Sequence, residues 1–110
     1  MAIVNAQLTT TQLDIITVPA SKSYAITNIM VCNNGSTTAT FDMHFVPQSS
    51  SLSNAVTRVI NSLELPVGET FTFDSERIVL EVGDKLAFVA EPDSGAGLTA
   101  LSATVSYLEV

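Results

Sequence analysis

Apolar and polar residues alternate with a period of two in several short segments, which is the pattern of a half-buried β-strand. The alternation is clearest around Phe71 and Phe73, and again between Leu101 and Tyr107. Segments at 3–8 and 14–18 are shorter strand candidates. We therefore predict a strand at each of these places.

Residues 23–46 carry β-branched and aromatic side chains in two runs, with the polar segment 33–38 between them. This arrangement predicts two strands joined by a turn. In the second strand, alternate side chains from Phe41 to Phe45 share one face, which we expect to lie in the core. The opposite face carries His44, and we expect it to be in contact with water.

Both faces of the first of these two strands are largely apolar. One face is expected to carry Tyr24, Ile26, Met30 and Cys32, and the other Ala25, Thr27, Ile29 and Val31. A strand that is apolar on both faces suits a position covered on both sides, and in a small antiparallel domain the second cover can be another subunit. We therefore predict an interface formed by Ala25, Thr27, Ile29 and Val31.

Two further segments contain turn or strand signals. Residues 55–65 fit helical spacing, while 60–65 also fits a strand, and we favour the strand for this second half. Residues 78–82 and 85–91 flank Gly83, and glycine supplies the positive φ that tight turns need. We therefore predict a hairpin here.

The predicted elements add up to about seven to nine short strands, spaced by about 8–12 residues and separated by turn signals. No helical segments separate them, so the pattern predicts an all-β, antiparallel β-sandwich or jelly-roll-like fold. A chain of 110 residues fits one hydrophobic core. We therefore expect residues 1–110 to form a single domain, in which residues 1–14 are an arm or an edge strand.

Charged residues are scarce, at 14% of the chain, whereas 46% of the residues are hydrophobic. Soluble domains typically contain about 25% charged residues. The mean hydropathy is +0.38, yet no segment approaches the roughly 20 apolar residues that a membrane-spanning helix needs. We therefore expect no membrane partner, and we expect the surplus of apolar side chains to be covered by a protein interface.

The net charge bears on partners and location. Eleven acidic and four basic residues give −7, which opposes binding to nucleic acid. The first residues contain no basic segment followed by an apolar one, so we expect no signal peptide and synthesis in a cytoplasm.

Residues that carry catalysis occur singly in this chain. His44 is the sole histidine, and Asp42 lies on the same face of the predicted strand, about 7 Å along it, which is too far to orient the imidazole. We interpret His44 as a surface or interface residue. Cys32 is the sole cysteine and lies in an apolar run without cationic neighbours, so we expect a buried thiol. We predict no enzymatic activity.

Metal and cofactor sites also lack the necessary residues. One histidine and one cysteine cannot supply a structural zinc site. An acidic group in the sequence could offer oxygen ligands to calcium, but it lacks calcium-loop spacing, and a solvated rim is the favoured interpretation. This group comprises Asp74, Glu76, Glu81 and Asp84. The glycines at 95 and 97 lack the lysine and helix of a phosphate loop, so we predict no metal and no cofactor.

Three motifs and the last strand add a comparison. They are Val18-Pro-Ala-Ser-Lys-Ser-Tyr-Ala-Ile-Thr-Asn-Ile-Met-Val-Cys-Asn33, Leu65-Pro-Val-Gly-Glu-Thr-Phe71, Val82-Gly-Asp-Lys-Leu86 and Leu101-Ser-Ala-Thr-Val-Ser-Tyr-Leu108. Together they resemble small β-sandwich virion proteins of tailed bacteriophages, of the marine and cyanobacterial phage type. The resemblance covers residues 15–110.

The resemblance implies a structural protein of the virion, such as a capsid decoration or cement protein, or a neck or tail component. We expect it to form a homo-oligomer such as a trimer, and to contact major capsid or tail proteins. The loops at 33–38, 48–54 and 92–97 are further expected contact surfaces. The alternative is a receptor- or carbohydrate-binding module of a tail fibre, although the chain has no tryptophan for sugar stacking.

Overall fold

The computed structural model describes residues 2–35, 38–53, 55–73, 78–90 and 101–110. These residues contain nine strands and no helix, so no helix in this part of the chain could cross a membrane. The strands are β1 (Ala2–Gln7), β2 (Leu13–Thr17), β3 (Tyr24–Asn33), β4 (Ala39–Val46), β5 (Arg58–Leu65), β6 (Thr70–Phe73), β7 (Ile78–Leu80), β8 (Lys85–Ala90) and β9 (Leu101–Glu109). The predicted all-β class is confirmed, and so is the strand at 60–65.

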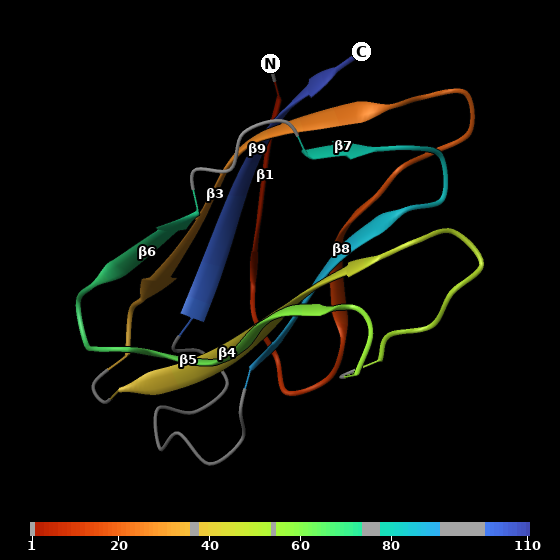
Figure 1. Ribbon diagram of the computed structural model, residues 1–110. Helices are drawn as coiled ribbons and strands as arrows, with labels where there is room; N and C mark the ends of the chain where they lie inside the picture. The colour runs from red at the N-terminus through yellow and green to blue at the C-terminus, as the bar shows by residue number, and fades with distance from the viewer. Residues whose placement is uncertain (1, 36–37, 54, 74–77, 91–100) are drawn as a thin grey trace.

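The strands form two antiparallel sheets packed face to face (Figure 1). Sheet A has the order β1-β9-β3-β6, with β7 also paired to β3, and sheet B has the order β2-β8-β4-β5. Because β9 occupies one side of β3, β6 and β7 share the other side and fill one position in the sheet. Consecutive positions then switch sheets everywhere except at β4 and β5, which is the winding of a jelly roll.

The core lies between the two sheets and is built from alternate side chains of the paired strands. In sheet B, Phe41 and Phe88 are fully buried, with ring centroids 6.1 Å apart. Phe41 also contacts Phe71 of sheet A, edge to face, at 6.0 Å. Burial of each such side chain contributes about 1.5–3 kcal/mol. The predicted core face of residues 41–45 therefore holds the sheets together.

A β-bulge in β3 changes which side chains face the core. The register with β9 shifts between Ile26 and Asn28, so one extra residue is inserted there and the alternation restarts with the opposite phase. Ile26 precedes the bulge, Ile29 and Val31 follow it, and all three point inward, with Ile29 and Val31 at 0% exposure. The predicted division of this strand into two faces is therefore wrong for its second half.

The turn at Gly83 forms as predicted, but the two strands beside it do not pair with each other. Gly83 has a φ of +83°, and its N–H donates to the Val18 carbonyl at 2.9 Å. β7 belongs to sheet A and β8 to sheet B, so the turn carries the chain from one sheet to the other. The predicted hairpin is wrong because a tight turn does not specify whether its flanking strands pair.

Candidate interaction surface

The outer face of sheet A is defined by the side chains that point away from the core. By the observed registers these are Ile3, Asn5, Gln7, Ala25, Thr27, Asn28, Met30, Cys32, Thr70, Thr72, Val79, Ser102, Thr104, Ser106 and Leu108. None of these described residues is charged. Ordinary domains carry about 25% charged residues and keep most of them on the surface, so a sheet face without any charge is unusual.

Apolar side chains are exposed on this face. Ile3 is 67% exposed, Val79 48%, Leu108 38% and Met30 37%. They come from four strands, β1, β7, β9 and β3, and the registers place Val79, Leu108 and Ile3 toward the β7 end of the sheet, with Met30 nearer its centre. Apolar and methionine side chains without neighbouring charges are typical of the centre of a protein interface.

The polar groups of the same face are partly paired with one another. The hydroxyls of Thr27 and Ser106 lie 2.6 Å apart across β3 and β9. Ser102, also on β9, accepts a hydrogen bond from the Asn34 side-chain amide at 2.9 Å. A polar group that already has a partner costs less to remove from water than an unpartnered one. The face is therefore suited to being covered by another protein.

The four predicted interface residues are separated by the bulge. Ala25 and Thr27 lie on the outer face, whereas Ile29 and Val31 lie in the core, so the assignment of the latter two is wrong. Met30 and Cys32 take their places on the outer face. Two-residue alternation identified the strand, but it assumed a single phase, whereas the phase changes at the consecutive polar residues Thr27 and Asn28.

Cys32 is half-buried on this outer face rather than a buried thiol. Its Sγ atom lies 3.4 Å from Oδ1 of Asn34, the residue that also donates to Ser102. His44 belongs to sheet B, so the two residues lie on opposite layers and do not form a nucleophile and base pair.

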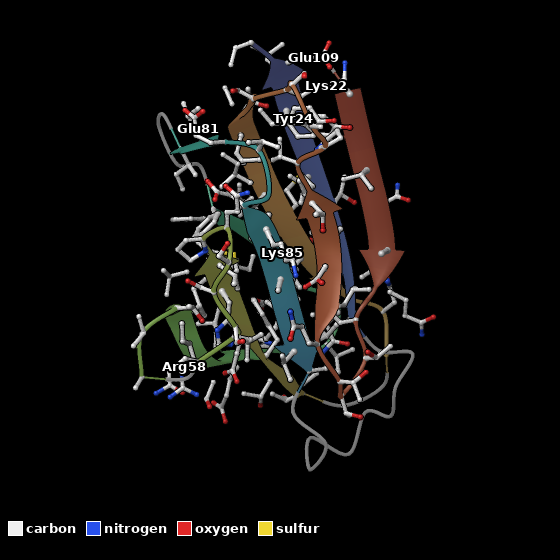
Figure 2. All side chains as sticks on the ribbon, turned by 90° about the vertical axis from the view of Figure 1, so that its right-hand side faces the viewer. Lys22, Tyr24, Arg58, Glu81, Lys85 and Glu109 are labelled. Atoms are coloured by element: carbon white, nitrogen blue, oxygen red, sulfur yellow. The ribbon has the colours of Figure 1, made fainter. Side chains whose placement is uncertain are left out.

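The ion pairs of the described residues lie away from the outer face of sheet A. Lys22 Nζ contacts Glu109 Oε2 at 2.6 Å, at the end of the molecule opposite Arg58 (Figure 2). The hydrogen bond and negative charge of Glu109 raise the pKa of Lys22. The other two pairs, Lys85 with Asp14 and Arg58 with Asp42, belong to sheet B. Charge is thus distributed unevenly between the two sheets.

His44 lies on the outer side of β4, yet it is fully buried. Its Nδ1 lies 2.8 Å from the Thr57 hydroxyl, which in turn donates to the Ser53 carbonyl at 2.9 Å. Nδ1 therefore carries the proton, and Nε2 has no hydrogen-bond partner among the described residues. Burial lowers the pKa of His44, while the charge of Asp42 opposes this effect. The predicted surface position is wrong, because the imidazole is fully buried and contacts Thr57.

Asp42 is also buried, at 6% exposure, and it serves the backbone of β5. Its Oδ1 accepts the Ser62 N–H at 2.6 Å, and its Oδ2 lies 3.7 Å from Nη1 of Arg58. Ser62 has a φ of +52°, and the register between β4 and β5 shifts beside it. The carboxylate therefore holds a bulged edge strand in place. The expectation that this face is in contact with water is wrong for both Asp42 and His44.

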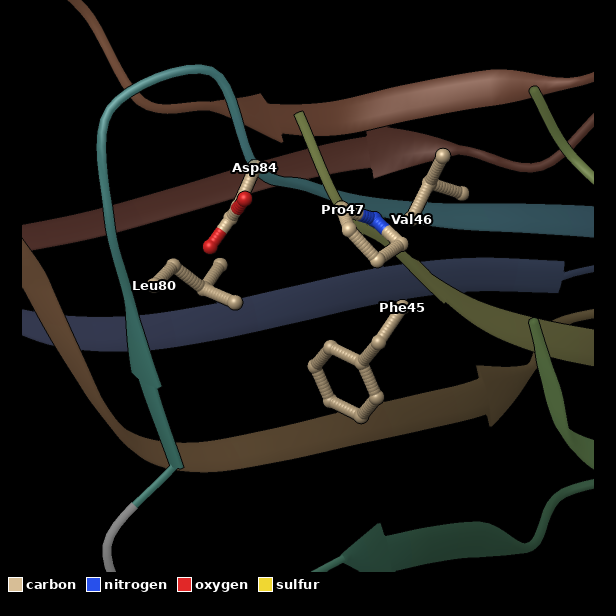
Figure 3. Close-up of a pocket in the computed structure, with 5 residues that line it drawn as sticks. All are labelled: Phe45, Val46, Pro47, Leu80 and Asp84. Carbon is tan, nitrogen blue, oxygen red and sulfur yellow. The ribbon is translucent and has the colours of Figure 1, made fainter. Parts of the chain in front are cut away.

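A small pocket lies at one end of the sandwich, between β4 and β7 (Figure 3). It is lined by Phe45, Val46, Pro47, Leu80 and Asp84 and has a volume of about 90 Å³. Ligand pockets usually measure about 300–1,000 Å³. The one charged lining group, Asp84, accepts the N–H groups of Gln48 at 2.8 Å and Glu81 at 2.9 Å. Asp84 therefore stabilises two turns by hydrogen bonds. The pocket offers a ligand little room and little free charge.

No three potential metal-ligating side chains gather within the described residues. Asp74 and Glu76 of the acidic group, and the loop at 92–97, lie outside them. Comparison with protein-family models gives no match, and no curated protein shows significant sequence similarity to the chain. The inference of a function therefore depends on the composition and geometry of the surfaces, of which the outer face of sheet A is the most distinctive.

Proposed function

We propose that the chain is a non-enzymatic structural subunit that assembles with copies of itself and with neighbouring proteins through the outer face of sheet A. The observation that carries the proposal is the absence of charge from this face, on a chain whose net charge is −7. The assembly is the particle of a tailed bacteriophage, in which the subunit is a capsid decoration or cement protein, or a neck or tail component.

The uneven distribution of charge favours self-assembly. Copies with a net charge of −7 repel one another where their charges approach. Contact through the outer face of sheet A brings no described charged side chains together across the interface. The same contact removes Ile3, Met30, Val79 and Leu108 from water.

The phage particle is supported by the motifs at 18–33, 65–71 and 82–86, which resemble those of phage virion proteins. A jelly roll also occurs in viral capsid domains, but it occurs in lectin domains and cupins as well. The fold alone therefore does not distinguish among these roles.

The alternative, a carbohydrate-binding module, would require exposed aromatic rings. The two tyrosines and five phenylalanines of the chain all lie within the described residues, and none of them is exposed. Tyr24 and Tyr107 pack on each other with ring centroids 4.5 Å apart. No described residue therefore favours this alternative.

The test is a charge placed on the proposed face. We expect the wild-type protein to self-associate in sedimentation velocity, or to bind phage particles assembled without it. Met30→Asp should weaken this association, because it places a carboxylate where a neighbour would exclude water. Val56→Asp is the matched control, since Val56 is 81% exposed and lies in the loop beside sheet B.

Two results would overturn the proposal. The first is a wild-type protein that stays monomeric at high concentration and is not retained by particles. The second is a folded Met30→Asp variant that assembles as well as wild type and Val56→Asp. The second result would reject this face in particular.

A further inference from the structure

β1 forms an edge of sheet A and has the features of a strand that is open to pairing. Its register with β9 is uninterrupted from Ala2↔Tyr107 to Gln7↔Ser102. Its sequence, AIVNAQ, has no charge and no proline. Proteins usually protect edge strands with charges, prolines, bulges or short length, because unpaired main-chain groups otherwise recruit another strand.

The other edges of the sandwich each carry such a protection. β2 has a register shift and the charged residue Asp14, and β5 has register shifts beside Ser62, whose φ is +52°. On the far side of sheet A, β6 and β7 have four and three residues. Residues 74–77 between them include three charged residues. β1 is therefore the regular and uncharged edge among the described strands.

The direction of the main-chain groups along β1 follows from one hydrogen bond. The Leu8 N–H donates to the Leu101 carbonyl at 2.9 Å, so the main-chain groups of Leu8 point toward β9. Successive residues of a strand direct these groups to opposite sides, so those of Val4 and Ala6 also point toward β9. The N–H and C=O groups of Ile3 and Asn5 consequently point to the open edge.

We infer that β1 pairs antiparallel with β1 of a second copy, around a two-fold axis that passes midway between the two Val4 residues. This inference rests on the proposed function, because it names one contact of the proposed assembly. In this register Ile3 faces Asn5 of the second copy, and their outward N–H and C=O groups form four hydrogen bonds across the axis. The sheets of the two copies then become one continuous sheet.

The sequence of β1 is suited to this axis. Its core-side residues, Ala2, Val4 and Ala6, are symmetric about Val4 in both size and polarity. A two-fold interface brings the same patch together twice, so it requires self-complementarity of this kind. Val4 already packs against the core, and its contact with Val4 of the second copy extends that core across the axis.

A second copy fits this edge better than a charged strand from another protein. β1 offers no charge with which to select an oppositely charged partner, and it presents no like charge to its own copy. The pairing also places the two outer faces of sheet A side by side. The result is a single uncharged surface, twice as wide, for the neighbours of the proposed assembly.

The test uses a substitution that acts on the open edge alone. Asn5→Pro removes an N–H that points away from β9, so the fold should tolerate it. It should nevertheless weaken self-association at least about tenfold, since losing paired hydrogen bonds costs more than the 1.4 kcal/mol that corresponds to tenfold. Asn5→Ala is the matched control, because it changes the same side chain and keeps the N–H.

The register is tested by disulfide formation in a Cys32→Ser background. Val4→Cys should give a covalent dimer on mild oxidation, because directly opposed residues in a non-hydrogen-bonded pair have the Cα spacing that a disulfide needs. Ala6→Cys should not, because the two copies of residue 6 lie about 13 Å apart along the strands in this register.

The outcomes separate the inference from the proposed function. A folded Asn5→Pro variant that self-associates as well as Asn5→Ala, in a protein whose wild type assembles, overturns the β1 pairing and leaves the proposed function standing. Equal cross-linking at residues 4 and 6 overturns the register. A wild-type protein that is monomeric at high concentration overturns the β1 pairing whether or not particles bind it, and overturns the proposed function as well if they do not.

Discussion

Nδ1 of His44 lies 2.8 Å from the hydroxyl of Thr57, and this contact joins the outer side of β4 to the residue that precedes β5. The same hydroxyl donates to the Ser53 carbonyl and accepts the Ser53 N–H, both at 2.9 Å. The Thr57 hydroxyl thus links Ser53 to the imidazole of His44. The chain keeps its sole histidine neutral and buried for a structural reason.

We expect this buried histidine to make folding stability depend on pH. Burial lowers the pKa of His44 below its ordinary value of 6.5, so the unfolded chain binds the proton more tightly than the folded one. The contribution is fully present above pH 6.5 and is lost as the pH falls toward the folded-state pKa. Urea denaturation should therefore show a lower free energy of unfolding at about pH 5.5 than at about pH 7.5.

The control for this prediction is His44→Asn, whose amide can still donate to Thr57 but does not titrate. Its stability should change less between the same two pH values, whatever its absolute value. An equal pH dependence in the two proteins would assign the effect to other groups.

Asp42 is expected to stabilise the bulged strand β5 through its hydrogen bond to Ser62. Asp42→Ala removes the acceptor of a partly buried N–H and should cost about 1–3 kcal/mol of folding free energy. Asp42→Asn keeps an oxygen acceptor and loses the charge that faces Arg58, so it should cost less. Chemical denaturation of the two variants measures the difference, and equal costs would contradict the assigned role.

Gly83 is expected to be more sensitive to alanine than Gly68. Both have positive φ, at +83° and +78°, so alanine strains either turn by about 1 kcal/mol or more. A Cβ at Gly83 would in addition lie 2.6 Å from Cγ of Gln48, whereas nothing lies within 4 Å at Gly68. Gly83→Ala should therefore melt below Gly68→Ala in a thermal scan, and the reverse order would contradict this packing.

Ile29 and Met30 are neighbours with opposite environments, and an aspartate should distinguish them. Ile29 is 0% exposed, so Ile29→Asp buries a charge and should prevent folding. Met30 is 37% exposed on the outer face, so Met30→Asp should keep the far-ultraviolet circular dichroism and cooperative melting of wild type. A folded Ile29→Asp protein would show that the bulge at Ile26–Asn28 is misplaced.

The strands and the fold class could be predicted because alternation is a local property of the sequence. Phe71, Phe73 and the segment 101–107 showed it directly, and the structure places strands there. The bulge at Ile26–Asn28 arises from pairing with β9, nearly 80 residues away at Ser106, and its local sign, the consecutive polar residues Thr27 and Asn28, does not specify a bulge by itself. The Gly83 turn was visible in the sequence. The sheet that each of its flanking strands joins was not, because it depends on the whole fold.

The candidate surface was only partly predictable for the same reason. Ala25 and Thr27 were placed on the outer face, but Ile3, Val79 and Leu108 were not, because they reach that face through pairings distant in sequence. The scarcity of charge in the composition was the available signal. The gathering of uncharged residues on one face became visible once the strands were arranged in sheets.

Cys32 allows the central claim to be tested without any substitution, because this half-buried thiol lies on the outer face of sheet A. The measurement is the rate of its alkylation by a small thiol reagent, at protein concentrations below and above those at which sedimentation shows assembly. We predict that the rate per thiol falls as the protein assembles, because the neighbouring subunit covers this face. A rate that stays constant while the protein assembles would show that another surface makes the contacts, and would contradict the claim.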